Sequence, residues 1–336
     1  MAPWRIPFSL FLALLSPRAL GASAVEIIPT ARGCEDFAFD ADAAAPRLIL
    51  SCSERRDPAN PMGGLYALNL ENHQLRPLAL AGIELESFHP HGISLTRGPQ
   101  GARLYVINHQ AKKQNSRKRD FSQVLVFDVV GDRLNFVADL GAADGAHLFG
   151  VVAFGAPNDL VALEDGQIFL TNPASPHPLL RYSPHDHRWT TAATGMIYPN
   201  GVHVKGERLY LNVSDRGHQF AYDLRDGRLS NRRVHARRLG AVDNITESVA
   251  GDLLYPGAVN VVEYFRYFLN ESFVPRSRVF RDRGTELQQL DFSELSETIS
   301  SPSVSYEYRD RLYLGQVFEN FVAVIHHPTW GARDAF

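Results

Sequence analysis

One short strand phrase recurs six times along this chain, and it constrains the fold more than any other feature. Each copy is a run of about five residues in which aliphatic or aromatic side chains alternate with others, and a polar turn precedes it. Successive copies are separated by roughly 40 to 65 residues. The copies are Arg47–Ser51, Arg103–Asn108, Gln167–Asn172, Arg208–Asn212, Asp252–Tyr255 and Arg311–Gly315.

A second strand-like segment precedes several copies, and a third follows several of them. Repeats of this period and strand content are typical of β-propellers, so the sequence predicts an all-β, six-bladed β-propeller. An array of β-sandwiches is the alternative, but it would not bring the same turn of every copy to one axis. In a propeller the innermost strand of each blade faces the central channel, and equivalent positions converge. The preceding segments are 34–40, 92–96, 158–163 and 201–204, and the following ones are 64–69, 123–129, 179–183 and 219–224.

The segment from Ser87 to Ser94, SFHPHGIS, begins one of these predicted inner strands. It places two histidines, a rigid proline and a permissive glycine at the end of a loop. We expect this segment to direct His91 into the space that the strand lines. The unperturbed pKa of a histidine, about 6.5, suits proton transfer near neutral pH. A histidine that only packs in the core is the alternative interpretation.

Four other short segments carry carboxylate or amide oxygens at the edges of predicted strands. Calcium binds six to eight oxygens. Zinc prefers thiolate and imidazole ligands, and the sequence has no cluster of cysteines and histidines that would supply them. Adjacent side chains of a strand point in opposite directions, so Asp36 and Asp159 can serve a second ion, above the first or on the opposite side of a turn. The sequence therefore predicts a central channel that contains calcium. The oxygen donors to the first ion are Glu35, Asn158, Asn200, Asp243 and Asn244.

Each of these donors also has an ordinary structural interpretation when it is taken alone. Asn200-Gly201 is a common turn dipeptide, and Asp243-Asn244 is common in turns and helix caps. The metal interpretation depends on the whole set, because its members occur at matching positions of successive predicted blades.

Length and charge restrict the class of protein. The chain has 336 residues and a net charge of −3, which favours one large globular unit and argues against a nucleic-acid partner. The basic run 112–119 is interpreted as a solvated loop, with a patch that faces phosphate or lipid as the alternative. The segment Val261–Val274 is compatible with a short helix or with two strands.

Residues 1–24 have the pattern of a secretory signal peptide. Arg5 supplies the charge, Ile6–Leu15 supplies an apolar core too short to span a bilayer, and Gly21–Ala24 supplies small residues for cleavage. An uncleaved N-terminal anchor is the alternative, and it would allow peripheral contact with a membrane or lipid. We therefore expect a secreted or extracytoplasmic protein whose residues 25–336 form the propeller domain.

Cys34 and Cys52 are the two cysteines of the chain. In a secretory compartment such a pair favours one disulfide, worth roughly 3 kcal/mol for a loop of this length, and two buried thiols are the alternative. Asn212 and Asn270 lie in glycosylation sequons. Asn244 lies in a third sequon but is expected to be buried at the metal.

The chain resembles the serum paraoxonase/arylesterase family, within the wider SMP-30/gluconolactonase-like six-bladed propellers. The phrases that carry the resemblance follow the order expected for the family, from about residue 34 to residue 325. As an ordered set they are specific, although each is weak alone. They are Cys34–Asp36, Phe88–Ser94, Val106–His109, Asn158–Ala162, Asn200-Gly201, Val242–Ile245 and the closing strand 312–325.

The resemblance implies a calcium-dependent hydrolase of small aryl esters or lactones. It implies a catalytic calcium held by the five donors named above, and a structural calcium held by Asp36, Asp159 and the backbone carbonyl of Ile93. It also implies that His91 is the general base and that His109 lies behind it as a relay. In such a site calcium polarises the carbonyl while His91 takes a proton from the attacking water.

The chain departs from the family pattern in three places. Asn172-Pro173-Ala174 stands where the family carries an acidic residue followed by histidine, which leaves the relay through His109 with less support. The family's disulfide joins the chain ends, whereas here any bridge is the local one between Cys34 and Cys52. The basic run inserted beyond His109 is expected to alter the range of substrates.

Two further classes of function compete with the hydrolase. One is a secreted propeller that binds a partner and keeps calcium only for stability, although a purely structural metal would not need His91 beside it. The other is a strictosidine-synthase-like condensing enzyme, which would not need the full set of oxygen ligands.

Overall fold

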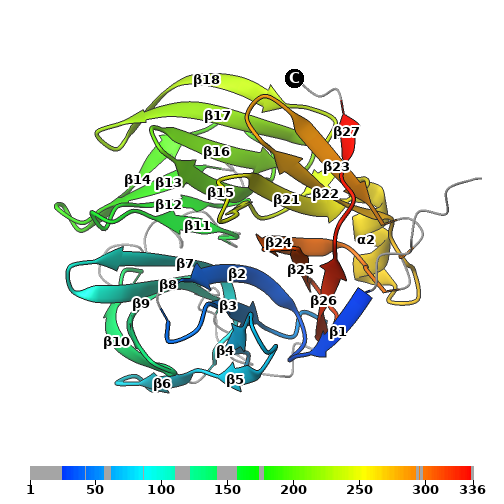
Figure 1. Ribbon diagram of the computed structural model, residues 1–336. Helices are drawn as coiled ribbons and strands as arrows, with labels where there is room; N and C mark the ends of the chain where they lie inside the picture. The colour runs from blue at the N-terminus through cyan, green and yellow to red at the C-terminus, as the bar shows by residue number, and fades with distance from the viewer. Residues whose placement is uncertain are drawn as a thin grey trace, which may run out of the picture.

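The computed structural model describes residues 25–41, 43–56, 62–85, 87–109, 122–141, 157–173, 178–292, 295 and 298–333. Its strands form six sheets around one axis, which confirms the predicted all-β, six-bladed propeller (Figure 1). The predicted signal peptide or anchor at residues 1–24 and the basic run 112–119 lie outside the described residues. No helix in the described part of the chain is long and apolar enough to cross a membrane.

The repeated phrase forms the second strand of every blade, and the segment before it forms the strand nearest the axis. Because a second strand is covered on both faces by neighbouring blades, all six residues of the first one are buried. The inner strands are β2 (Cys34–Asp40), β7 (Pro90–Gly98), β11 (Leu160–Ala162), β15 (Pro199–Lys205), β19 (Ala241–Val242) with β20 (Thr246–Glu247), and β24 (Pro302–Tyr308). The second strands are β3 (Arg47–Cys52), β8 (Gly101–His109), β12 (Ile168–Thr171), β16 (Arg208–Val213), β21 (Leu253–Ala258) and β25 (Arg311–Gln316).

The third and outer strands complete each blade as an antiparallel sheet. The third strands are β4 (Gly64–Asn69), β9 (Ser122–Val130), β13 (Leu179–Ser183), β17 (His218–Arg225), β22 (Ser277–Asp282) and β26 (Phe321–His326). The outer strands are β5 (Leu75–Pro77), β10 (Arg133–Asp139), β14 (Arg188–Ala193), β18 (Arg228–Ala236), β23 (Leu287–Asp291) and β1 (Val25–Pro29). Two short strands extend the outer edges: β6 (Ala79–Ala81) pairs with β10, and β27 (Gly331–Arg333) pairs with β23.

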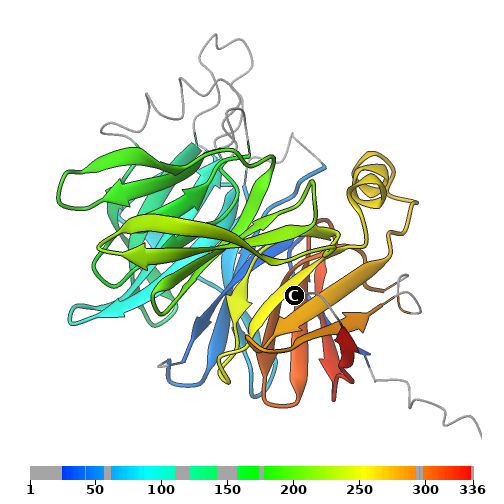
Figure 2. The ribbon, with the colours of Figure 1, turned by 90° about the horizontal axis from the view of Figure 1, so that it is seen from above.

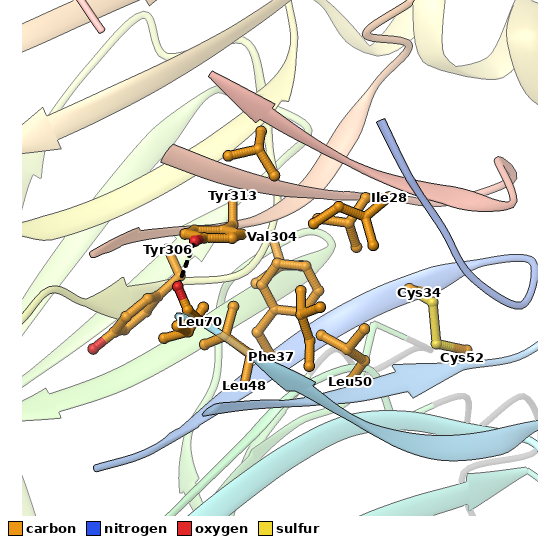
Figure 3. Close-up of a cluster of buried hydrophobic side chains, with 13 residues drawn as sticks. Ile28, Cys34, Phe37, Leu48, Leu50, Cys52, Leu70, Val304, Tyr306 and Tyr313 are labelled. Atoms are coloured by element: carbon orange, nitrogen blue, oxygen red, sulfur yellow. Dashed lines mark hydrogen bonds between the residues drawn. A yellow bond between two sulfur atoms is a disulfide. The ribbon is translucent and has the colours of Figure 1, made fainter. Parts of the chain in front are cut away.

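The first and last strands close the ring. Strand β1 pairs antiparallel with β26, from Val25 opposite Ile325 to Pro29 opposite Phe321, so the chain's beginning completes the last blade. Figure 3 shows the apolar cluster that joins this blade to the first one, with Phe37 and Leu48 facing Val304. Five similar clusters fill the other interfaces between neighbouring blades. Burial between blades therefore holds the inner strands at fixed positions around the axis.

The segment Val261–Val274, for which a helix or two strands were predicted, begins with helix α2 (Val261–Leu269). Asn260 caps the start of the helix, because its side-chain oxygen accepts a hydrogen bond from the Glu263 N–H, and its side-chain amide also donates to the Glu263 carboxylate. Figure 2 shows α2 beyond one end of the strands, over one face of the propeller. The α2 residue Tyr267 is buried and its ring packs against Phe318.

Candidate metal centre and active site

Each inner strand brings polar side chains to the same end of the central channel. Glu35 lies on β2 and Asn200 on β15, while Asn158 directly precedes β11. Asp243 and Asn244 lie in the short connection between β19 and β20. A cavity of about 250 Å³ is lined by four of these donors, Glu35, Asn158, Asn200 and Asp243. The fifth, Asn244, is buried and donates its amide N–H to the backbone carbonyl of Glu35 at 2.8 Å.

Two glycines let these strands approach one another. A Cβ on Gly92 would lie 2.6 Å from the backbone oxygen of Asn158, and one on Gly201 would lie 2.3 Å from the backbone oxygen of Asp243. Any side chain at either position would push the next blade's donors away from the axis. This is the physical reason why glycine follows His91 and Asn200 in the sequence.

The asparagines present their carbonyl oxygens to the site. The Asn200 amide nitrogen donates to Ser214 Oγ at 3.0 Å, and the Asn244 amide donates to Glu35 O, so both nitrogen ends are occupied elsewhere. The Oδ1 atoms of Asn158, Asn200 and Asn244 are buried and accept no hydrogen bond from the described residues. A buried acceptor without a donor is costly, and two of these acceptors, on Asn158 and Asn200, line the same cavity, where a cation or ordered water would satisfy them.

The two carboxylates of this group are also short of positive charge. Burial raises the pKa of Glu35, and the Arg55 guanidinium, which contacts Glu35, opposes that rise. Burial and the neighbouring Glu35 raise the pKa of Asp243 well above its usual range. Two carboxylates and three unpaired amide oxygens fit an oxygen-binding cation such as calcium. Among the described residues no group of three or more His, Cys, Asp or Glu side chains could hold a metal ion by itself.

The neighbouring acidic residues line a different cavity from four of the five donors. Asp36 and Asp159 line a second cavity of about 260 Å³, together with Ile93. Asp36 accepts hydrogen bonds from the N–H groups of Phe37 and Ile93, at 2.8 and 2.6 Å. Asp159 accepts from Leu160 and Val202, both at 2.7 Å, so each carboxylate links two neighbouring blades.

The pKa values of both these carboxylates are raised. Burial is the largest cause for each, and the charge of Asp159 adds to the rise at Asp36. The predicted division of Glu35 and Asp36, and of Asn158 and Asp159, between two places in the channel thus matches the geometry. Their roles as ligands stay predictions.

The two predicted histidines form a hydrogen-bonded pair beside the carboxylate of Glu35. His91 Nδ1 lies 2.8 Å from His109 Nε2, and His91 Nε2 lies 3.4 Å from Glu35 Oε2. His109 Nδ1 lies 2.9 Å from Ser122 Oγ on β9. Burial, Arg55 and the partner histidine lower the pKa of His91 well below its usual range, and burial and nearby cationic groups lower the pKa of His109 to about 3. Both rings are therefore neutral near pH 7, as a proton acceptor must be.

All ten predicted site residues lie around this one channel. Sequence reasoning missed five residues that complete it: Arg55, Ser122, and the aromatic residues Tyr198, Tyr264 and Phe265, which line the first cavity. None of them lies in a repeated motif, so the sequence offered no signal for them.

The predicted disulfide is confirmed between Cys34 and Cys52, which are directly paired on β2 and β3. The sequon at Asn212, one of two possible glycosylation sites, is not accessible in the folded protein. Asn212 is fully buried, and its amide donates to the backbone oxygen of Asp243 at 2.7 Å. The sequon at Asn270 stays a prediction at an exposed position.

No protein-family model matches the chain, and neither does any curated protein. Solved propellers are similar to it over nearly their whole length. A gluconolactonase of Xanthomonas campestris is 17% identical with a TM-score of 0.55, covering 92% of this chain and 90% of its own. The Malassezia sympodialis allergen Mala s 1 is 13% identical with a TM-score of 0.57, covering 90% and 95%. A luciferin-regenerating enzyme is 12% identical with a TM-score of 0.54, covering 93% and 97%. At these identities the likeness shows the six-bladed propeller fold alone.

Proposed function

We propose that this protein is a calcium-dependent hydrolase of aryl esters or lactones, as in the paraoxonase/arylesterase family. One observation carries the proposal: two carboxylates and two asparagines with unpaired amide oxygens line one cavity, beside a neutral histidine that hydrogen-bonds to a second histidine. The solved gluconolactonase with this fold supports a lactone as the substrate. The propeller alone does not, because an allergen also shares it.

Glu35, Asn158, Asn200, Asp243 and Asn244 would hold the catalytic calcium. Asp36, Asp159 and the Ile93 carbonyl would hold a second, structural calcium. A calcium ion at the first site supplies an electrophile that polarises the substrate carbonyl and stabilises the negative charge that develops on its oxygen. The aromatic side chains of Tyr198, Tyr264 and Phe265 line the same cavity and would exclude water around the ester.

His91 would act as the general base through Nε2, the nitrogen that faces Glu35. When His91 Nδ1 donates to His109 Nε2, and His109 Nδ1 donates to Ser122, His91 Nε2 is left without a proton. It can then accept a proton from water as the oxygen of that water bonds to the carbonyl carbon. The proton passes on to the leaving phenol or alkoxide oxygen as its bond to that carbon breaks.

We also propose that the protein is secreted or extracytoplasmic, because the Cys34–Cys52 bridge needs an oxidising compartment. Purified protein from culture medium should therefore be oxidised. Recovery of the protein only from the reducing cytoplasm would contradict this part of the proposal.

The activity is tested with phenyl acetate and with a γ- or δ-lactone. Hydrolysis should stop when calcium is removed and return with calcium but not with zinc. His91→Gln is the matched control, because it should bind calcium as the wild type does but hydrolyse both substrates roughly 10²- to 10⁴-fold more slowly. If calcium stabilises the wild type but neither substrate is hydrolysed, the protein is a calcium-stabilised binding propeller. Full activity in calcium-free protein would also overturn the proposal.

A further inference from the structure

Arg55 is the one arginine or lysine in the described part of the chain that forms an ion pair with the channel carboxylates. It lies in the segment after β3, and its side chain is 15% exposed. Its guanidinium contacts the Glu35 carboxylate and donates to the backbone oxygen of Pro90 at 3.2 Å, directly before His91. Its Nε–H is buried and donates no hydrogen bond. The guanidinium is therefore only partly satisfied where it lies.

The charges in the channel show why this position matters. Glu35, Asp36, Asp159 and Asp243 together carry four negative charges when ionised, and Arg55 supplies one positive charge. Two calcium ions would supply four positive charges and balance the carboxylates without Arg55. Once both ions are bound, the guanidinium is a surplus cation beside a metal ligand, and Coulomb repulsion disfavours it there.

We propose that Arg55 is an internal counter-ion that competes with calcium for Glu35, so that it sets the calcium affinity of the catalytic site. This inference rests on the calcium site of the proposed function. Calcium can use both oxygens of Glu35 only in molecules where Arg55 has withdrawn. The apparent dissociation constant is therefore the intrinsic one divided by the fraction of molecules in which the ion pair is open.

The neighbouring residue supports a withdrawal that leaves the loop in place. Arg56 lies over the rings of Phe318 and Tyr267, at 4.0 and 4.7 Å from their centroids, and donates to the Tyr267 carbonyl at 2.8 Å. Arg56 thus fixes the backbone beside Arg55 to the underside of α2. Only the long, flexible Arg55 side chain needs to move when calcium arrives.

Calcium titration calorimetry on metal-depleted protein tests the inference. Arg55→Gln should bind calcium roughly 10- to 100-fold more tightly than the wild type, whereas Arg55→Lys keeps the charge and should stay near the wild-type Kd. Arg32→Gln is the matched control, because it removes one positive charge from an arginine whose side chain is 54% exposed and pairs with Glu54. Its Kd should be unchanged within about twofold, as expected for a screened surface charge.

A second measurement uses wild-type protein and so does not depend on the folding of a variant. In protein labelled at arginine Nε, the resonance of Arg55, whose Nε–H is buried without calcium, should shift or exchange more rapidly when calcium is added. Arg55→Lys assigns that resonance by its absence.

Equal calcium affinity in the wild type and Arg55→Gln, or an Arg55 resonance that calcium leaves unchanged, would overturn this inference alone. Failure of every variant to bind calcium would overturn it together with the calcium site of the proposed function.

Discussion

Removing calcium should make the stability of this protein fall as the pH rises from about 5 to about 7. Four carboxylates, Glu35, Asp36, Asp159 and Asp243, are buried in the channel, and burial is the largest cause of the raised pKa of each. For Asp159 the pKa reaches about 8. Without calcium, the native state therefore holds protons that the unfolded chain releases near pH 4.

The sign follows from this difference in bound protons. A carboxylate with a raised folded pKa contributes its full stability below its unfolded pKa, and that stability is lost as the pH rises towards the folded pKa. Each retained proton costs about 1.4 kcal/mol per pH unit, so one such group, Asp159, costs about 3 kcal/mol between pH 5 and 7. For a domain of roughly 300 residues this lowers the Tm by about 4 to 5 °C. Asp36 and Asp243 add to the loss.

Thermal denaturation at pH 5 to 7 measures this pH dependence of stability, on protein from which calcium has been removed with a chelating resin and on the same protein with calcium added back. With calcium bound, the carboxylates are ionised in both states, so the pH dependence over this range should largely disappear. Asp159→Asn keeps a side chain of similar shape but removes one titrating group. In calcium-free protein it should therefore make the loss of unfolding free energy smaller by about 1.4 kcal/mol per pH unit. Glu207→Gln changes an exposed residue and should not alter the slope. A calcium-free Tm that is equal or higher at pH 7 would refute the reasoning.

Three further changes test the site and the fold. His91→Gln should lower kcat for esters and lactones by roughly 10²- to 10⁴-fold with calcium affinity intact, and the kcat of His109→Gln should fall between that value and the wild type. Steady-state kinetics with both substrates measures this, and wild-type rates in His91→Gln would make His91 a packing residue. Asn244→Ala removes one unpaired oxygen and the hydrogen bond to the backbone oxygen of Glu35. Calcium binding measured by calorimetry should be at least tenfold weaker, and activity should be lost. An unchanged Kd would exclude Asn244 as a ligand. Replacing Cys34 and Cys52 by Ser should lower the free energy of unfolding by about 2 to 4 kcal/mol in denaturant titrations. The intact mass of the wild type without reductant should show no free thiol, and two free thiols would contradict the bridge.

The fold could be predicted from the sequence because each blade repeats one physical requirement. A second strand such as Arg47–Cys52 is covered on both faces, so its pattern of apolar residues recurs and marks the centre of every blade. The inner strands follow from that spacing, and with them the donors at equivalent positions. The helix at Val261–Leu269 could not be separated from two strands, because its exposed face carries Val262, Phe265 and Phe268 where a soluble helix usually carries polar residues.

The side chains that complete the site depend on contacts that no repeat encodes. Arg55 lies in the connection after β3, outside the repeated strand phrase, and its guanidinium contacts Glu35 on the paired strand β2. The orientation of the three asparagine amides depends on which neighbour accepts from each nitrogen, as Ser214 does for Asn200. Such partners lie on other strands or blades, so a linear pattern predicts which oxygen donors are present and not which of them are left unpaired.

The support of His109 shows how one such contact changes the chemistry that can be expected. Asn172 stands where the pattern that the sequence resembles has an acidic residue, and this departure predicted a poorly supported relay. In the structure, Ser122 Oγ lies 2.9 Å from His109 Nδ1, because β8 and β9 pair these two residues directly. A hydroxyl can fix the tautomer of His109, since it accepts one hydrogen bond from Nδ1–H. Unlike a carboxylate, it adds no negative charge that would stabilise a second imidazolium. The positive charge formed during proton transfer should therefore stay mainly on His91, beside Glu35. His109 then acts chiefly by holding His91 in position, which is why its replacement should cost less than that of His91.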